Sequence, residues 1–393
     1  MSNLNIESIR NNILEEIEQN KEFYIKVSNE IHQNPEIGNQ EYFACKTLTD
    51  LLKEHGFEVE INVAGHETGF IATKKSKDKE GPTIGFLAEY DALPSLGHAC
   101  GHNIIGVASC GAAIELSKQL DFIGGEIRVY GCPSEEGGEN GSAKGSFVRK
   151  NLFEGVDACL MIHPSNETSV TGTSLAVDPV EYEFIGKAAH ASGSPQEGIN
   201  ALDGVLQLFS GINALRQHVT DDVRIHGIIT HGGDAPNIVP DYAKARFYIR
   251  AKTRKTLDEV TKRVEGIAKG AALATGATVN INFFQNQVDD FKINNKFNDL
   301  FAEVIRDLGE EINTNPKEGK GSTDAGNVSQ IVPTIHPTIS IGDKDLVGHT
   351  VEFREAACSK RGNEGLILGV KSLSLTGLRL LTDRDILNEI KGE

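Results

Sequence analysis

Apolar side chains recur at two spacings along this chain, and each spacing predicts one kind of element. Apolar residues three or four positions apart predict amphipathic helices at residues 4–17 and 48–52. Short apolar runs predict strands at residues 57–61, 70–73, 83–88, 126–132 and 158–162. Between them, small residues mark a helix at 104–120 that can pack closely on a sheet. Strands separated by helices predict a layered α/β domain with right-handed crossovers.

The order of elements changes near residue 180. The pattern there predicts, in sequence, a strand at 180–187, a helix at 199–218, strands at 223–231 and 242–252, a helix at 257–275 and a strand at 278–284. This β-α-β-β-α-β order is the split-βαβ arrangement of a small α+β domain. Later segments predict a helix at 297–308, a strand at 334–341 and a helix at 362–381. We therefore expect a discontinuous domain, 1–179 and 291–393, interrupted by an inserted domain at 180–290.

Composition limits the classes of protein to which these domains can belong. The chain has 393 residues, 39% hydrophobic and 24% charged, so it can bury two ordinary cores. The formal net charge of −17 argues against nucleic acid, because phosphate binding requires clustered Lys and Arg. No unbroken apolar run reaches the roughly 18 to 20 residues of a membrane span, and the N-terminus lacks a signal-peptide pattern. We expect a cytoplasmic protein with no membrane or nucleic-acid partner.

Residues 89–103 carry the strongest chemical signal in the chain. They place carboxylates, a thiol and two imidazoles among Gly and Pro residues, directly after a predicted strand. In an α/β fold, ligands bind at the carboxyl ends of strands. The six cysteines of a chain without a secretion signal should be thiols rather than a disulfide framework. Cys100 is the exceptional one, because His98, His102 and two glycines surround it.

Three other segments offer side chains that bind metals. Glu135 and Glu136 follow one predicted strand, His163 follows another, and His349 lies in the C-terminal segment that returns to the first domain. Taken singly, each is more typical of a solvated surface glutamate or an ordinary loop or core histidine. Their joint occurrence is hard to explain by chance. The candidate ligands, five for two metals, are Cys100, His102, Glu136, His163 and His349.

Motifs in both domains resemble those of a known metallopeptidase family. They are Asp91-Ala-Leu-Pro, His98-Ala-Cys-Gly-His102, Glu135-Glu136, Gly186-Lys-Ala-Ala-His190-Ala-Ser and Asn237-Ile-Val-Pro-Asp. The sequence is similar to the aminoacylase and carboxypeptidase-G-type metallopeptidases. Within them it resembles the amidohydrolase branch of indole-acetyl-amino-acid hydrolases, aminobenzoyl-glutamate hydrolases and HmrA-like proteins. The segments 89–94 and 321–327 look similar to dipeptidase-like members, and the likeness covers nearly the whole chain.

The resemblance implies a fold, an activity and a set of roles. The fold is α/β: a phosphorylase/hydrolase-like catalytic domain of three layers around a mixed sheet, with an inserted ferredoxin-like α+β lid that serves dimerisation. The implied activity is metal-dependent hydrolysis of the amide bond of N-acyl amino acids or short peptides. The five candidates above are then metal ligands, and Glu135 is the general base. We expect two divalent metal ions, with zinc or manganese first. A thiolate favours zinc, and paired sites with His and carboxylate also take manganese, nickel or cobalt.

One position departs from other branches of the family. Those branches carry a His-x-Asp motif whose His binds metal, and this chain has Glu89 in place of that His. The amidohydrolase branch also lacks this His and uses the Cys-Gly-His ligands instead, so the loss does not imply an inactive enzyme. We expect Asp91 to orient a histidine ligand and set its tautomer. The structural alternative is an Asp that caps the turn before Leu93 and Pro94.

Three residues of the inserted domain have expected roles in substrate binding. The resemblance implies that His190 donates to the developing oxyanion, often in the partner subunit's site. Asn237 and Arg250 would hold the free carboxylate of a small N-acyl amino acid or peptide, a task that suits the guanidinium fork. The alternatives are a lid-surface histidine and an outward-facing strand arginine. We expect a homodimer or higher homo-oligomer, formed through the lid.

Two hypotheses from other classes remain open. One is a cysteine hydrolase, with Cys100 as nucleophile and His98 or His102 as base. It predicts activity that resists chelators and is lost on alkylation alone. The other is a catalytically idle binding protein on the same scaffold, which would normally have lost Glu135 or a metal ligand. The sequence retains all of these residues.

Overall fold

The computed structural model describes residues 5–319 and 321–392. Within this part the chain forms two compact units, and each has its own apolar core. The first unit comprises the described residues of Met1–Thr173, Phe291–Gly319 and Asp324–Glu393. The second comprises Ser174–Asp290 and the described residues of Lys320–Thr323.

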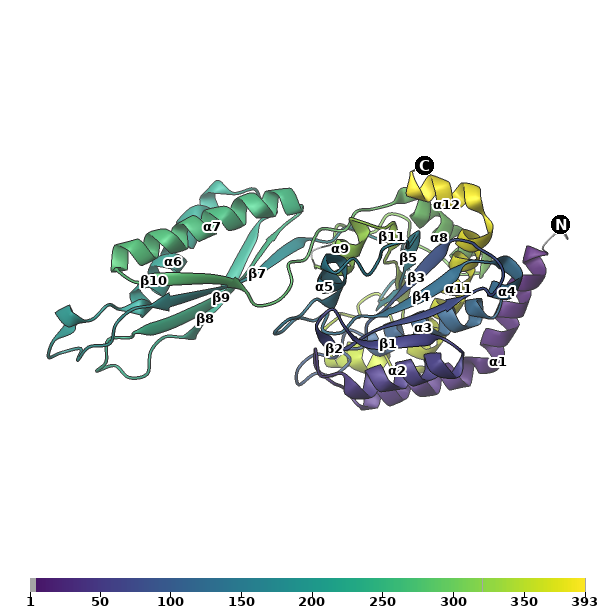
Figure 1. The fold of residues 1–393 in the computed structure, drawn as a ribbon, viewed down its shortest axis with the longest axis horizontal. Helices are drawn as coiled ribbons and strands as arrows, with labels where there is room; N and C mark the ends of the chain where they lie inside the picture. The colour runs from purple at the N-terminus through teal and green to yellow at the C-terminus, as the bar shows by residue number, and fades with distance from the viewer. Residues whose placement is uncertain (1–4, 320, 393) are drawn as a thin grey trace. The chain divides into compact units, whose positions relative to one another are not determined.

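A six-stranded mixed sheet forms the middle layer of the first unit (Figure 1). Its strands are β1 (Glu58–Val63), β2 (His66–Lys75), β3 (Thr83–Ala88), β4 (Glu126–Gly131), β5 (Ala158–Leu160) and β11 (Thr334–Ile335). They lie in the order β1-β2-β4-β3-β5-β11. Neighbours among β1, β2 and β4 pair antiparallel, whereas β3 pairs in parallel with β4 and β5, and β11 pairs in parallel with β5. The carboxyl ends of β3, β4 and β5 therefore meet at one edge.

Helices cover both faces of this sheet. They are α1 (Ile6–Gln33), α2 (Tyr42–Glu54), α3 (His102–Ser117), α4 (Leu120–Ile123), α5 (Ala143–Arg149), α8 (Asn295–Asp307), α9 (Ala325–Ser329), α10 (Val351–Ala356), α11 (Lys360–Thr382) and α12 (Arg384–Lys391). Alternate side chains of a strand point to opposite faces, and β3 shows the result. Ile84 and Phe86 enter the larger core with α1, α3 and α11, whereas Leu87 enters a smaller core with α5 and α9. These are the three layers that the resemblance implies.

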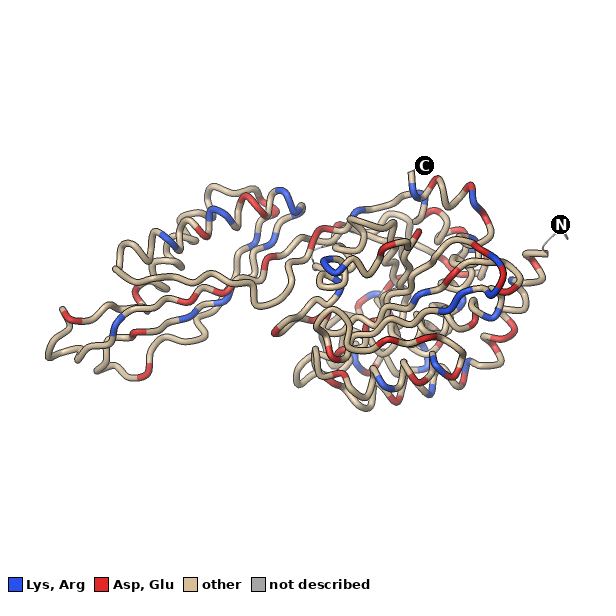
Figure 2. The backbone as a smooth tube through the Cα atoms, in the orientation of Figure 1, with Lys and Arg blue, Asp and Glu red and all other residues tan. Residues whose placement is uncertain are grey.

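Apolar and charged side chains separate clearly in the first unit. The helix α11 is long and apolar enough to cross a membrane, but 78% of its apolar window is buried inside the protein. It packs against α1 and α3, and these contacts account for its apolar character. In contrast, acidic and basic residues are interspersed along α1 and α2 (Figure 2).

The second unit is an antiparallel sheet backed by two helices. Its elements are β7 (Ala176–Ile185), η1 (Pro195–Glu197), α6 (Ala201–Leu215), η2 (Arg216–His218), β8 (Arg224–His231), β9 (Tyr242–Ala251), α7 (Arg254–Thr275) and β10 (Thr278–Phe283). The strand order is β10-β7-β9-β8, and all neighbours are antiparallel. Buried and half-buried residues alternate along β9, whose buried face packs on α6 and α7. This unit has the predicted ferredoxin-like fold.

The structure corrects one predicted element in the first unit. The single strand expected at residues 334–341 is two strands, β11 and β12 (Thr338–Ser340), separated by His336 and Pro337. Proline has no amide hydrogen and interrupts a ladder of backbone hydrogen bonds. The chain then leaves the main sheet, and β12 pairs with β6 (His163–Ser165). As a result, the rings of His163 and His336 lie close together, with centroids 5.4 Å apart.

Candidate metal centre

Asp91, just beyond the end of β3, connects two segments that carry candidate ligands. Its Oδ1 lies 2.8 Å from Nδ1 of His102. Because a carboxylate can only accept, Nδ1 carries the proton and the lone pair of this imidazole is on Nε2. The other oxygen, Oδ2, accepts the backbone N–H of Glu136 at 2.9 Å. Asp91 therefore orients His102 and at the same time holds the loop that carries Glu136.

A glycine at the start of α3 places Cys100 and His102 beside His163. Gly101 has φ of 76°, a left-handed conformation that glycine adopts without strain. A Cβ atom at this position would lie 2.4 Å from Cγ of Pro164. The helix can therefore begin against the His163–Pro164 segment only with glycine at this position.

The loop after β4 carries the paired glutamates, and a buried carboxylate holds its start. Glu41 accepts the backbone N–H of Ser134 at 2.8 Å and the hydroxyl of Thr68 at 2.7 Å. Burial, and secondarily the nearby charge of Asp91, raise the pKa of Glu41 to about 7. Ser134 has a left-handed φ of 59°, and its hydroxyl donates to the carbonyl of Gly137. These contacts fix the turn from which the side chains of residues 135 and 136 project.

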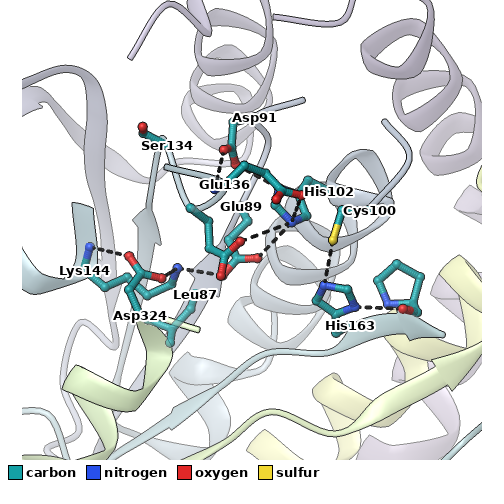
Figure 3. A network of polar contacts seen from close by, with 12 residues as sticks. Leu87, Glu89, Asp91, Cys100, His102, Ser134, Glu136, Lys144, His163 and Asp324 are labelled. Atoms are coloured by element: carbon teal, nitrogen blue, oxygen red, sulfur yellow. Dashed lines mark hydrogen bonds and ion pairs between the residues drawn. The ribbon is translucent and has the colours of Figure 1, made fainter. Parts of the chain in front are cut away.

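The five candidate ligands meet at one place in the first unit. Figure 3 shows four of them, Cys100, His102, Glu136 and His163. One triplet of donor atoms comes from Cys100, His102 and His163, and a second from Cys100, Glu136 and His349. The Sγ of Cys100 lies 3.4 Å from Nε2 of His163, and Nε2 of His349 lies 3.6 Å from Oε1 of Glu136. His349 is the most exposed member and is anchored by its backbone N–H, which donates to Ala99. The thiol of Cys100 belongs to both triplets.

The donor atoms fit divalent cations in type and in spacing. Within the described residues, Nε2 of His102 and Oε1 of Glu136 are buried and have no hydrogen-bond partner. Leaving such atoms unpaired costs roughly 1 to 3 kcal/mol each, which a bound cation would offset. Ligand atoms about 2.0 to 2.3 Å from one tetrahedral cation lie roughly 3.3 to 3.8 Å apart, the range of the two distances above. A thiolate shared between two imidazole- and carboxylate-containing triplets suits a pair of cations.

Glu135 lies beside these ligands. Its Oε2 is 3.8 Å from Nε2 of His102, and its side chain is largely buried. Burial foremost, and then the charges of Glu89 and Glu136, raise the pKa of Glu135 well above its usual range. A carboxylate with raised proton affinity, next to the site where a cation would polarise water, can take up and return a proton. This geometry suits the role of general base.

The environment of Cys100 does not suit a cysteine nucleophile. Burial raises the pKa of its thiol above the usual range, whereas catalytic cysteines have lowered values. The alternative base His98 is buried and stacks on His32, with ring centroids 6.0 Å apart. Its pKa falls to about 3, mainly through burial. These features disfavour the cysteine-hydrolase hypothesis.

Sequence reasoning missed a buried group of charges next to the site. Lys144 is completely buried, and its Nζ lies 2.6 Å from Oε1 of Glu89 and 2.5 Å from Oδ1 of Asp324. The segment 321–327 contains Asp324 and resembles dipeptidase-like members, but that likeness implies no role for the residue. Glu89 stands out in the sequence only as a departure from the His-x-Asp motif. Nothing in the sequence around Lys144 marks it as a site residue.

The three expected substrate-binding residues lie in the second unit. Nδ1 of His190 accepts the backbone N–H of Ser192 and Gly193, at 3.3 and 3.1 Å, so its proton is on Nε2. Asn237 lies beside it, since its carbonyl accepts the N–H of Ala191. Each of these positions is exposed at its loop.

Arg250 projects from the open face of β9. Its Nη1 donates to the hydroxyl of Ser322 at 2.7 Å, and its guanidinium lies over the ring of Tyr248, 5.4 Å from the centroid. Its Nε lies 3.4 Å from Nε2 of His226. Stacking on Tyr248 and bonding to Ser322 fix the orientation of the fork, which a carboxylate-binding arginine requires.

Similar proteins include dipeptidases and hydrolases. Residues 179–276 match the sequence profile of a peptidase dimerisation domain. The Xaa-Arg dipeptidase of Mus musculus is 34% identical over 407 residues, which cover 99% of this chain and 92% of that protein. One of the subunits of the p-aminobenzoyl-glutamate hydrolase of Escherichia coli K12 is 37% identical over 288 residues, covering 68% of this chain and 59% of that protein.

Solved structures share the fold over nearly the whole chain. An aminobenzoyl-glutamate utilization protein from Klebsiella pneumoniae has a TM-score of 0.76 at 19% identity, covering 94% of this chain and 98% of that one. A dinuclear metal binding peptidase of the M20 family from Bacillus subtilis has a TM-score of 0.65 at 20% identity, covering 93% and 99%.

Proposed function

The chain belongs to the M20 family of metallopeptidases and amidohydrolases, and from this premise we propose that it cleaves the amide bond of dipeptides or N-acyl amino acids. One observation carries the proposal. Two donor triplets share Cys100, and Glu135 lies 3.8 Å from His102 at their edge. Candidate metal ligands and a candidate general base thus lie close together, which supports the proposal.

The residues divide the chemistry among them. Divalent cations in this site would polarise the scissile carbonyl and lower the pKa of a water molecule. Glu135 takes the proton of the attacking water and delivers it to the leaving nitrogen. Asp91 keeps the proton of His102 on Nδ1, which leaves Nε2 free to bind metal. The proposed ligands are Cys100, His102, Glu136, His163 and His349.

The second unit would supply the groups that recognise substrate. We assign His190 to the developing oxyanion, because its Nδ1 accepts two N–H donors and its Nε2–H is left to donate. Asn237 and Arg250 are assigned to the terminal carboxylate, supported by the fixed guanidinium of Arg250. A substrate with a free carboxylate agrees with the names of two similar proteins, the Xaa-Arg dipeptidase and the p-aminobenzoyl-glutamate hydrolase.

The metal and the assembly belong to the same proposal. Zinc is favoured by the thiolate of Cys100, and manganese is the second candidate because imidazoles and a carboxylate complete the set. We propose a homodimer formed through the second unit. The match of residues 179–276 to a peptidase dimerisation domain supports this assembly.

The test measures metal and activity together. Purified protein is analysed for bound metal and then assayed on a panel of dipeptides and N-acyl amino acids, with and without a chelator. We expect hydrolysis that the chelator abolishes and that added zinc or manganese restores. Full activity in a metal-free preparation, combined with inactivation by alkylation of Cys100, would instead establish the cysteine hydrolase.

A further inference from the structure

A buried triad of charges next to the metal centre joins three distant segments of the first unit. Lys144, in α5, contacts Glu89 at the end of β3 and Asp324 before α9. All three side chains are at most 1% exposed. The backbone N–H of Lys144 also donates to Oδ2 of Asp324, at 3.0 Å. Asp324 therefore holds Lys144 through two hydrogen bonds, and Lys144 in turn donates to Oε1 of Glu89.

The other oxygen of Glu89 points into the metal centre. Oε2 is buried and has no hydrogen-bond partner among the described residues, and the same is true of Nε2 of His102. The two atoms are 3.6 Å apart. That separation is too long for a hydrogen bond, and it falls within the roughly 3.3 to 3.8 Å expected between two ligands of one tetrahedral cation.

The charges around Glu89 indicate what kind of group fits between its Oε2 and Nε2 of His102. Lys144 supplies one positive charge to the two carboxyl groups of Glu89 and Asp324, so it can balance only one of them when both are ionised. A charge so deeply buried is costly unless it is paired. The lysine approaches only Oε1, which leaves Oε2 to a second positive group. A cation bound to Nε2 of His102 would supply that group.

We propose that Glu89 is a further metal ligand, which binds through Oε2 the cation held by His102. Lys144 and Asp324 are positioning residues, because they act through Oε1 of Glu89. The proposal rests on the metal-dependent function proposed above and adds a ligand to the five candidates. Glu135 lies near the same two atoms, and Glu89, His102 and Glu135 form a third donor triplet. Fixing Glu89 on the cation leaves Glu135 free for proton transfer.

The experiment compares three variants of the full chain with the wild type. Glu89→Gln keeps the shape and an oxygen for Lys144 but removes the charge that would bind metal. Glu89→Asp keeps the charge opposite Lys144 and withdraws the oxygen from the centre. Glu115→Gln is the matched control, because Glu115 is also buried and accepts from a lysine, Lys118. It lies thirteen residues beyond His102 on α3, about 20 Å away.

Two readouts besides activity decide the outcome. Apo proteins, shown to be folded by circular dichroism, are titrated with Co²⁺, and the affinity and the visible absorption spectrum are recorded. We expect both Glu89 variants to bind one of the two cations about tenfold more weakly or worse, with an altered spectrum, because a lost ligand costs at least as much as a lost supporting partner. Glu115→Gln should match the wild type.

The contrary results are equally definite. Wild-type affinity and spectrum in Glu89→Gln would overturn the proposal, and if that variant does not fold, the same result in Glu89→Asp would overturn it. If Glu89→Asp behaves as wild type while Glu89→Gln does not, charge rather than ligation matters, and the proposal is wrong. In these cases the proposed function stands as long as the wild type binds cations and hydrolyses. A wild type that binds no cation refutes the proposed function itself.

Discussion

At the scale of single residues, two carboxylates near the site, Asp91 and Glu89, each contact different partners with their two oxygens. Asp91 holds the imidazole of His102 with one oxygen and the loop of Glu136 with the other. Glu89 gives one oxygen to Lys144 and turns the other toward His102. Because each carboxylate contacts two segments, a shift of one segment also affects the position of the other. A substitution at either position is therefore expected to disturb more than one contact.

Glu135 provides the sharpest test at this scale. Replacement by Gln preserves the shape of the side chain but removes the basic group, so kcat should fall by about 10²- to 10⁴-fold. Bound metal should stay at the wild-type level, because Glu135 is not among the five proposed ligands. Both quantities are measured on the same preparation. A variant that keeps most of its kcat would show that another group transfers the proton.

His66 predicts a dependence of stability on pH that is independent of the metal. Burial lowers the pKa of this histidine to about 4, from 6.5 in an unfolded chain. Because the unfolded state binds the extra proton first, stability is full above pH 6.5 and is lost as the pH falls toward 4, by up to about 3 kcal/mol. Denaturant unfolding of the apo protein at pH 7 and pH 4.5 measures the loss. His66→Gln should reduce it, whereas His55→Gln, at a partly exposed position, should not.

At the scale of elements, the site depends on how strands end and α3 begins. Strand ends of β3, β4 and β5 meet at one edge, and tight turns follow two of them. Gly101 lets α3 start against Pro164, so Cys100 and His102 face His163. The interruption at Pro337 moves the chain from β11 into β12 and brings His336 to the same region. Backbone geometry at these points decides which side chains meet.

Gly101→Ala tests this dependence. The new Cβ would lie 2.4 Å from Pro164, and φ of 76° is strained for alanine. We expect a loss of stability on the order of 1 to 3 kcal/mol and reduced metal content, because Cys100 and His102 must shift. Gly155→Ala is the control: its φ is also left-handed, at 77°, but no atom lies within 4 Å of its Cβ. Thermal melts and metal analysis should separate the clash from the backbone strain. Equal effects in the two variants would argue against a role for the Pro164 contact.

At the scale of the whole molecule, the chain is an enzyme of two units that have separate hydrophobic cores. The larger core and a smaller one lie in the first unit, and a third core lies entirely in the second. The second unit exposes apolar side chains on its edge strand β8, Ile228 and Ile229. An exposed, apolar edge strand is a surface that commonly pairs with another copy. Assembly therefore belongs to the second unit in our proposal, and the metal centre to the first.

Excision of the second unit tests this division. Residues 174–290, expressed alone, contain the whole of that core and should unfold cooperatively with heat. Light scattering coupled to size-exclusion chromatography should give the mass of a dimer. Ile228→Lys should shift the mass toward the monomer, because it places a charge on the exposed edge. A fragment that stays monomeric at all concentrations would locate dimerisation elsewhere.

The sequence by itself determined most of the elements, their order and the side chains available to bind metal. Hydrophobic spacing located most helices and strands, and the split-βαβ order identified the ferredoxin-like unit, because both signals depend on residues that are close in the chain. Glycine, proline and ligand-forming side chains after strands indicated where a site would form. The short helices α5, α9, α10 and α12 were not predicted. The single strand expected at 334–341 was wrong, since a proline within an apolar run marks a break but not where the chain goes next.

Only the tertiary structure decided which side chains share a contact. Lys144 is 55 residues from Glu89 and 180 from Asp324, and no local pattern links them. The sharing of Cys100 between two donor triplets, and the orientation of Oε2 of Glu89 toward His102, likewise follow from the packing of α3, α5 and the strand ends. Periodicity reports which face of an element is buried, whereas a site is set by distances between elements. Those distances arise only when the sheet and its helices are assembled.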